Sequence, residues 1–127
     1  MGLTLTALPD RLAVCRLDAG DPIPAWGTRG PFVSITRTPE ELSVTCPEGD
    51  VPEGIRAERG FVPLKVEGPL DFALTGILAS VAGPLADAGI SLFAIATFDT
   101  DYVLVRAERL LDATAALRAA GHVVRAA

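Results

Sequence analysis

The second half of the chain alternates between strand-like and helix-like segments, and this alternation constrains the fold more than any other feature. Short apolar runs that predict strands lie at residues 61–66, 91–97, 102–105 and 122–124. Between them, apolar residues recur at helical spacing over about 72–87 and 108–120. The order β-α-β-β-α-β is that of the ferredoxin-like fold, an antiparallel sheet with two helices on one face. We therefore predict an α+β domain.

The two helical segments carry their own start, stop and core signals. The first helix is expected to bury a stripe consisting of Leu74, Ile77, Leu78, Val81 and Leu85. Asp71 is a plausible N-cap for it, Pro84 predicts a kink or break near Gly83, and Gly89 is expected to end it. In the second helix, the residues expected to face the core are Leu110, Leu111, Thr114 and Leu117.

The first half of the chain is β-rich and is separated from the second by a turn segment. Residues 47–54 are too rich in Pro, Gly and acids to form a strand or helix interior. We therefore predict an N-terminal subdomain at 1–57 and a C-terminal domain at 58–127. Residues 35–48 align without a gap on 95–108, which suggests an internal duplication whose first copy is degenerate. In that copy the helices are expected to shrink to residues 22–26 and 51–54.

Composition excludes several classes of protein. A net charge of −5 argues against a nucleic-acid binder, which needs a concentrated basic face. No apolar run reaches the ~18 residues of a membrane span, and no secretory signal pattern begins the chain, so we expect a soluble cytoplasmic protein. Two separated cysteines and one histidine, His122, give no metal-ligand spacing, so no metal and no cofactor are expected. Because nucleophile and phosphate-binding motifs are also absent, no catalytic residue is assigned.

Three short motifs carry a family resemblance. Gly-Pro-Leu-Asp-Phe at 68–72 and Thr-Phe-Asp-Thr-Asp-Tyr at 97–102, together with Pro-Ile-Pro-Ala-Trp at 22–26, resemble bacterial ACT-domain proteins related to the cytosolic arginine-sensor subunits of animals. The resemblance covers nearly the whole chain. It implies tandem ferredoxin-like ACT domains and a regulatory module, not an enzyme. It also implies an amino acid bound at the interface between paired modules, in a homodimer.

The resemblance, joined to the chemistry of the residues, indicates a ligand site. The candidate residues are Gly68, Asp71, Phe72, Leu74, Thr75, Gly76, Ile77, Ser91, Leu92, Thr97, Phe98 and Asp101. The Gly68 turn is expected to free backbone N–H groups at a helix N-terminus for a ligand carboxylate. The family's acid at the position of Asp101 meets the cationic end of the ligand, and Ser91 and Leu92 match a strand start that faces the ligand from the partner module.

Simpler interpretations stand beside these. Asp71 is equally a helix cap, Gly76 a packing glycine, and Phe98 a core residue. Ala73-Leu74-Thr75 replaces an acid of the arginine-sensing relatives, so a neutral or smaller amino acid is as well supported as arginine. Two alternative functions remain: an interaction subunit whose pocket is vestigial, and a small enzyme that works through carboxylates.

Overall fold

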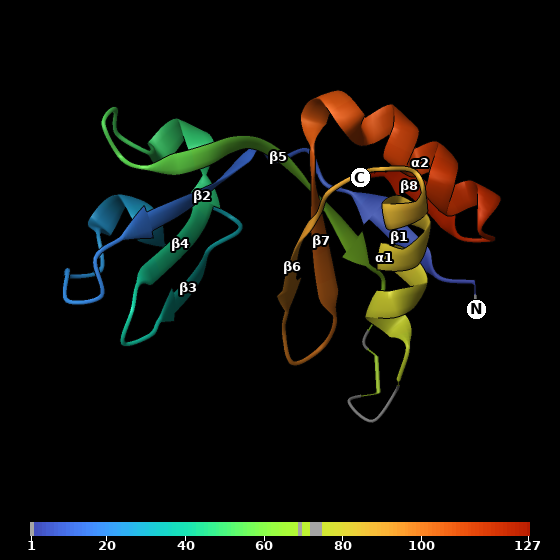
Figure 1. Cartoon of the computed structure of the whole chain (residues 1–127), viewed down its shortest axis with the longest axis horizontal. Coiled ribbons are helices and arrows are strands. Elements are labelled where there is room, and N and C mark those ends of the chain that lie inside the picture. The colour runs from blue at the N-terminus through green and yellow to red at the C-terminus, as the bar shows by residue number, and fades with distance from the viewer. Residues whose placement is uncertain (1, 69, 72–74) are drawn as a thin grey trace. The chain divides into compact units, whose positions relative to one another are not determined.

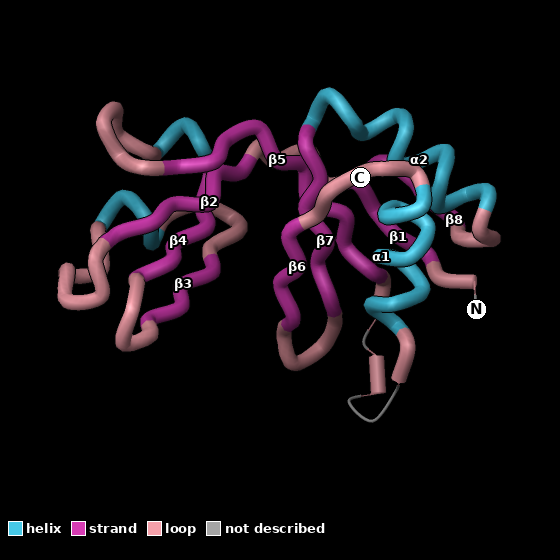
Figure 2. Tube along the Cα trace, in the orientation of Figure 1, coloured by secondary structure: helices cyan, strands magenta, loops and turns pink. Residues whose placement is uncertain are grey.

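The computed structural model describes residues 2–68, 70–71 and 75–127 (Figures 1 and 2). The chain divides into two compact units. Met1–Pro9 and Val62–Ala127 form the first, which we call the helical unit, and Asp10–Phe61 forms the second, which we call the strand unit. The sequence predicts a boundary after residue 57, with the first strand in the N-terminal part. The structure instead places that strand, β1 (Thr4–Ala7), in the helical unit.

The helical unit has the predicted β-α-β-β-α-β order. Its elements are the end of β5 (Ala57–Val66), α1 (Ile77–Asp87), β6 (Phe93–Ala96), β7 (Asp101–Arg106), the 3-10 turn η3 (Ala107–Arg109), α2 (Leu110–Ala119) and β8 (Val123–Ala126). Strand β7 pairs with both β5 and β6. The α+β ferredoxin-like prediction is confirmed. No helix within the described part of the chain is long and apolar enough to cross a membrane.

Strand β1 lies between β5 and β8 in the sheet of the helical unit. It pairs antiparallel with β5, where Leu5 lies opposite Val66, and parallel with β8, where Leu5 lies opposite Val124. All three of these side chains are buried in the same apolar cluster. The N-terminal strand therefore completes the core of a unit whose other elements begin about sixty residues later, which no local pattern could indicate.

Helix α1 begins later than predicted. Its N-cap is Gly76, with a left-handed φ of 78° that a side chain rarely adopts, so Asp71 is not the cap. The predicted first helical turns at 72–74 lie outside the described residues. The buried residues are Ile77, Val81 and Leu85. Leu78 is 39% exposed, so its assignment to the buried stripe was wrong. The buried residues recur every four positions, which makes a narrow stripe that does not include the residue next to Ile77.

Helix α1 continues through Pro84, and the predicted break does not occur. Proline lacks the N–H that would bond the carbonyl of Ser80 one turn earlier. The imidazole Nε2 of His122 lies 2.8 Å from that carbonyl oxygen, while its Nδ1 lies 3.1 Å from the backbone nitrogen of Leu3. Since a carbonyl only accepts and an amide N–H only donates, Nε2 carries the proton and Nδ1 accepts. His122 therefore replaces the donor that Pro84 lacks.

Helix α2 buries a narrower face than the sequence suggested. Ala113 and Leu117 are fully buried, and Leu110 packs partly against the core. Leu111, predicted to face inward, is 86% exposed. The helix follows η3 directly, and of the adjacent pair Leu110 and Leu111 only Leu110 contacts the core.

The strand unit contains four strands and two 3-10 turns among its described residues. They are β2 (Leu12–Leu17), η1 (Ala25–Thr28), β3 (Ser34–Arg37), β4 (Leu42–Pro47), η2 (Glu48–Asp50) and the first part of β5. Strand β2 pairs with β4 and β5, and β3 pairs with β4, all antiparallel. The β3–β4–η2 series has the same order as β6–β7–η3, which supports the proposed duplication. The second turn lies at Glu48–Asp50, not at the predicted 51–54.

Cys15 and Cys46 lie in the core of the strand unit. Both thiols are buried and free, as the sequence predicted. Burial raises the pKa of both thiols, to about 11 for Cys46, because the thiolate would lose its hydration. These cysteines are therefore small apolar core residues and poor nucleophiles.

Candidate functional site

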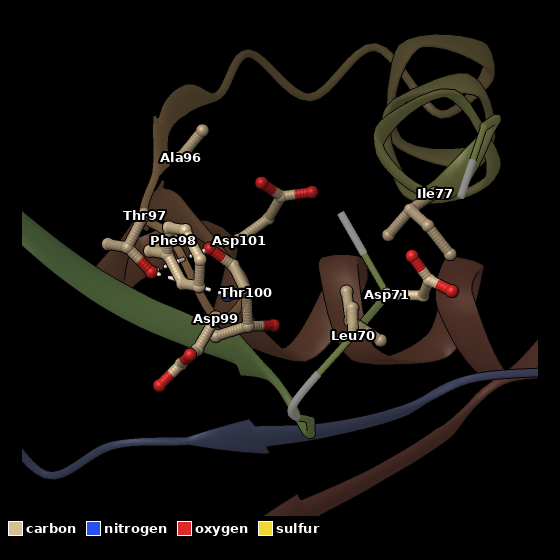
Figure 3. Close-up of a pocket in the computed structure, with 9 residues that line it drawn as sticks. All are labelled: Leu70, Asp71, Ile77, Ala96, Thr97, Phe98, Asp99, Thr100 and Asp101. Carbon is tan, nitrogen blue, oxygen red and sulfur yellow. Dashed lines mark hydrogen bonds between the residues drawn. The ribbon is translucent and has the colours of Figure 1, made fainter. Parts of the chain in front are cut away.

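The candidate site is built around the turn that joins β6 to β7. The backbone N and Oγ1 of Thr97 both donate to the carbonyl oxygen of Thr100 at 2.8 Å, and the N of Thr100 donates back to Thr97 Oγ1 at 3.3 Å (Figure 3). Thr100 is only 6% exposed, and its Oγ1 donates to the carbonyl oxygen of Val66 at 2.6 Å. The two threonines thus close the turn and fasten it to the end of β5.

The loop that follows β5 lies directly against this turn. The backbone N of Leu70 donates to the carbonyl oxygen of Asp99 at 2.8 Å. A Cβ at Gly68 would come within 2.9 Å of the Leu70 nitrogen and 3.3 Å of that same oxygen. Only glycine therefore permits this approach. Gly68 does not open a helix N-terminus as the sequence analysis expected, because α1 begins at Ile77.

A cavity of about 210 Å³ lies beside the turn, and we call it the helix-side cavity. Its lining residues are Leu70, Asp71, Ile77, Ala96, Thr97, Phe98, Asp99, Thr100 and Asp101. Five predicted site residues are among them: Asp71, Ile77, Thr97, Phe98 and Asp101. Sequence reasoning missed Leu70, Ala96 and Thr100, and assigned Asp99 to turn formation only. The Thr-x-x-Thr spacing of a side-chain-closed turn was the one available signal for Thr100.

The charge of the helix-side cavity is negative. Asp71, Asp99 and Asp101 all line it, and none of the described residues in its lining is cationic. In Figure 3 the carboxylate of Asp101 points into the space on the side of Ile77, whereas that of Asp99 points the other way. Within the described residues, no three Asp, Glu, His or Cys side chains are grouped to hold a metal ion. The carboxylates of Asp71 and Asp101 give the cavity a charge that attracts an ammonium or guanidinium group.

The apolar side of the cavity complements these carboxylates. Leu70, Ile77, Ala96 and Phe98 offer carbon surface for the body of a small ligand. Phe98 is 81% exposed, so its alternative interpretation as a plain core residue is wrong. Both threonine hydroxyls already donate within the protein, so they fix the shape of the site.

The other predicted site residues lie elsewhere. Thr75 and Gly76 are exposed and immediately precede α1. Ser91 is exposed, and Leu92 packs partly against the core just before β6. Phe72 and Leu74 lie outside the described residues.

A second cavity, of about 320 Å³, adjoins the same turn. Its lining residues are Lys65, Gly68, Thr97, Asp99, Thr100 and Tyr102. Gly68, one of the predicted residues, is thus found here and not in the helix-side cavity.

Comparison with known families finds two matches along the chain. A family model described as ACT domain matches residues 56–119, and a model for an N-terminal domain matches residues 10–54. The cytosolic arginine sensor for mTORC1 subunit 1 of Bos taurus is 32% identical over 98 residues, which cover 65% of this chain and 29% of the sensor. The human protein CASTOR3P is 34% identical over 91 residues, 61% of this chain and 56% of that protein. The chain thus spans well under two thirds of either relative.

Solved structures share the fold over nearly the full length. The Agrobacterium tumefaciens protein Atu0741 has a TM-score of 0.94 at 39% identity, covering 100% of this chain and 95% of its own. The Vibrio cholerae protein VC0802, titled a possible transport protein, has a TM-score of 0.77 at 21% identity, covering 94% and 91%. The regulatory subunit of aspartate kinase from Thermus thermophilus has a TM-score of 0.61 at 14% identity, covering 94% and 97%. The last two establish similarity of fold alone.

Proposed function

Since this chain belongs to the ACT-domain family, we propose that it is a non-catalytic regulatory module that binds an amino acid in the helix-side cavity. The observation that carries this proposal is the pairing, in one cavity of about 210 Å³, of the Asp101 carboxylate with an apolar wall. A carboxylate and carbon surface on facing sides match the amino group and the side chain of an amino acid. The threonine-closed turn holds Asp101 in place before the ligand arrives, which lowers the cost of binding.

The charge of the site narrows the ligand class. Asp71 and Asp101 favour a ligand with at least one cationic group. The bovine relative is named an arginine sensor, and arginine carries such a group at each end. A smaller neutral amino acid offers its α-ammonium alone and remains an equal candidate. The name of that relative also suggests the cytosol as the place of action.

We propose that two copies of the chain form a homodimer that completes the site. Strand β6 pairs with β7 and with no other strand among the described residues, so it forms an edge of the sheet. Its residues, Phe93 to Ala96, are uncharged and mostly exposed. An exposed apolar edge is commonly covered by another chain. Ser91 and Leu92 lie just before this strand, and Ser91, the exposed one of the two, is placed to contact a partner copy.

One observation favours a second candidate function. Phe98 lines the cavity and is 81% exposed, which is unusual for a large aromatic side chain. In an interaction subunit without a ligand, a partner protein would cover Phe98 and fill the cavity. The two functions differ in whether a free amino acid stabilises the isolated protein.

A thermal-shift screen of the purified protein against the twenty amino acids tests the proposal. A ligand at about 100 times its Kd adds roughly 2.7 kcal/mol to the free energy of unfolding. For a domain of this size we expect a rise in Tm of several degrees. The rise should disappear in Asp101→Asn. It should persist in Asp87→Asn, which removes the same charge from an exposed position in α1.

The failure of this screen would be informative. If no amino acid shifts the Tm of a protein that is folded and dimeric, the amino-acid proposal is wrong and the interaction subunit takes its place. If Asp87→Asn abolishes the shift as well, the effect reflects net charge and not the cavity.

A further inference from the structure

We propose that the second cavity is a separate binding site for a small monocarboxylate, with Lys65 as its anchor. The cavity has about 320 Å³ of space, more than the helix-side cavity, and the residues that line it all belong to the helical unit. Lys65 is the single lysine of the whole sequence. A chain that otherwise uses arginine for its cations thus places its one compact ammonium group in a cavity.

The two cavities lie on opposite faces of the sheet. Leu64 and Val66 belong to the cluster that packs against α1 and α2, so the intervening Lys65 points to the other face. Val103 and Val105 belong to the same cluster, and the same alternation sends Tyr102 to the face of Lys65.

Asp101, one residue before Tyr102, points to the helix side instead, as its place in the helix-side cavity shows. Alternation along β7 therefore places Asp101 in the helix-side cavity and Tyr102 in the second cavity, which also holds the Lys65 ammonium group.

The chemistry of the lining selects a carboxylate. Lys65 is half-buried and supplies positive charge, and the described residues give it no ion pair. The hydroxyl groups of Thr97 and Thr100 donate to the carbonyl oxygens of Thr100 and Val66, and Lys65 is the one cationic donor among the described residues that line the cavity. A partly buried ammonium group forms charge-assisted hydrogen bonds that are about twice as strong as neutral ones.

Asp99 limits which anion can enter. Its carboxylate lines the same cavity and, in Figure 3, points away from the side of Asp101. The charges of Lys65 and Asp99 cancel, so a bound monocarboxylate leaves a net charge of −1 in the cavity and a phosphate dianion leaves −2. Repulsion from Asp99 is therefore stronger for phosphate than for a monocarboxylate. A ligand that also carries an ammonium group, such as glycine, can pair with Asp99 as well as with Lys65.

The single lysine makes the test specific. Reductive methylation with ¹³C-formaldehyde labels Lys65 and the N-terminal amine and retains their charges. Titration with sodium acetate, glycine and inorganic phosphate is then followed through the ¹³C resonance of Lys65. We expect saturable shifts with acetate and glycine, and affinity for phosphate weaker by roughly ten-fold or more. Asp99→Asn should remove most of that difference.

Unlabelled variants give the matched controls through the backbone amide resonances of Gly68 and Thr100. Lys65→Met should lower the affinity for acetate by roughly ten-fold or more. Arg109→Met, which removes one positive charge from η3 at the opposite end of β7 from Tyr102, should leave the affinity unchanged. Asp101→Asn should also leave it unchanged, so this site can fail or succeed independently of the helix-side cavity. The inference is refuted if acetate causes no saturable shift, if phosphate binds as well as acetate, or if Lys65→Met binds acetate normally.

Discussion

Replacing His122 tests the idea that a side chain substitutes for the missing amide of Pro84. His122 is 5% exposed; its Nε2 donates to the Ser80 carbonyl oxygen and its Nδ1 accepts from the Leu3 N–H. His122→Ala leaves both backbone groups without their partner. A buried unsatisfied group costs about 1–3 kcal/mol, and Leu3 is half-buried, so we expect a total loss of about 2–4 kcal/mol in the free energy of unfolding.

A double-mutant cycle with Pro84→Ala isolates the contribution of the Ser80 bond. Alanine at position 84 restores the N–H that bonds the Ser80 carbonyl within the helix. His122→Ala should then cost about 1–2 kcal/mol less in the Pro84→Ala background than in the wild type. Urea unfolding followed by circular dichroism gives all four free energies, with equal m-values as the check that unfolding remains comparable.

The two nitrogens can also be separated by conservative variants. His122→Gln places an amide donor near the position of Nε2 and should retain much of the Ser80 bond. His122→Asn places its oxygen near Nδ1 and should retain the Leu3 bond. The reasoning fails if His122→Ala costs the same in both backgrounds within about 0.5 kcal/mol, which is the usual limit of additivity for independent sites.

Two further predictions concern the strand unit and the proposed dimer. Burial raises the pKa of Cys46 from 9.0 to about 11, so between these pH values the folded state keeps a proton that the unfolded chain has lost. The contribution of Cys46 to the free energy of unfolding should therefore be constant below about pH 9 and fall between pH 9 and 11. The midpoint of urea unfolding, measured as a function of pH, should show this fall in the wild type and a weaker fall in Cys46→Ala. Equal pH dependence in the two proteins would contradict the prediction. Ala94→Lys on the exposed edge of β6 should shift the mass measured by light scattering from dimer to monomer, while Ala86→Lys on the surface of α1 should not. A dimer that persists in Ala94→Lys would place the interface elsewhere.

Local patterns were sufficient to predict most of the elements. The strands at Leu12–Leu17 and Leu42–Pro47 and the two helices follow from apolar periodicity, because period two and period 3.6 are properties of neighbouring residues. The assignment of Asp101 to the site came from the family resemblance of the motif at 97–102 and not from periodicity. The limits of these patterns appear at Leu78 and Leu111, where two adjacent apolar residues compete for one buried position and the pattern does not choose between them.

The tertiary structure decided everything that depends on distant segments. Strand β1 fits between β5 and β8. Lys65 and Asp101 fall into different cavities because the packing of α1 and α2 decides which face of β5 and β7 is covered. The start of α1 at Ile77 and its passage through Pro84 depend on Gly76 and on His122, which is 42 residues from Ser80. The sequence by itself determined which residues prefer strand, helix or turn, since those preferences act over a few bonds. Only the folded chain could set which of them share a cavity, since that requires the register of strands that are far apart in the sequence.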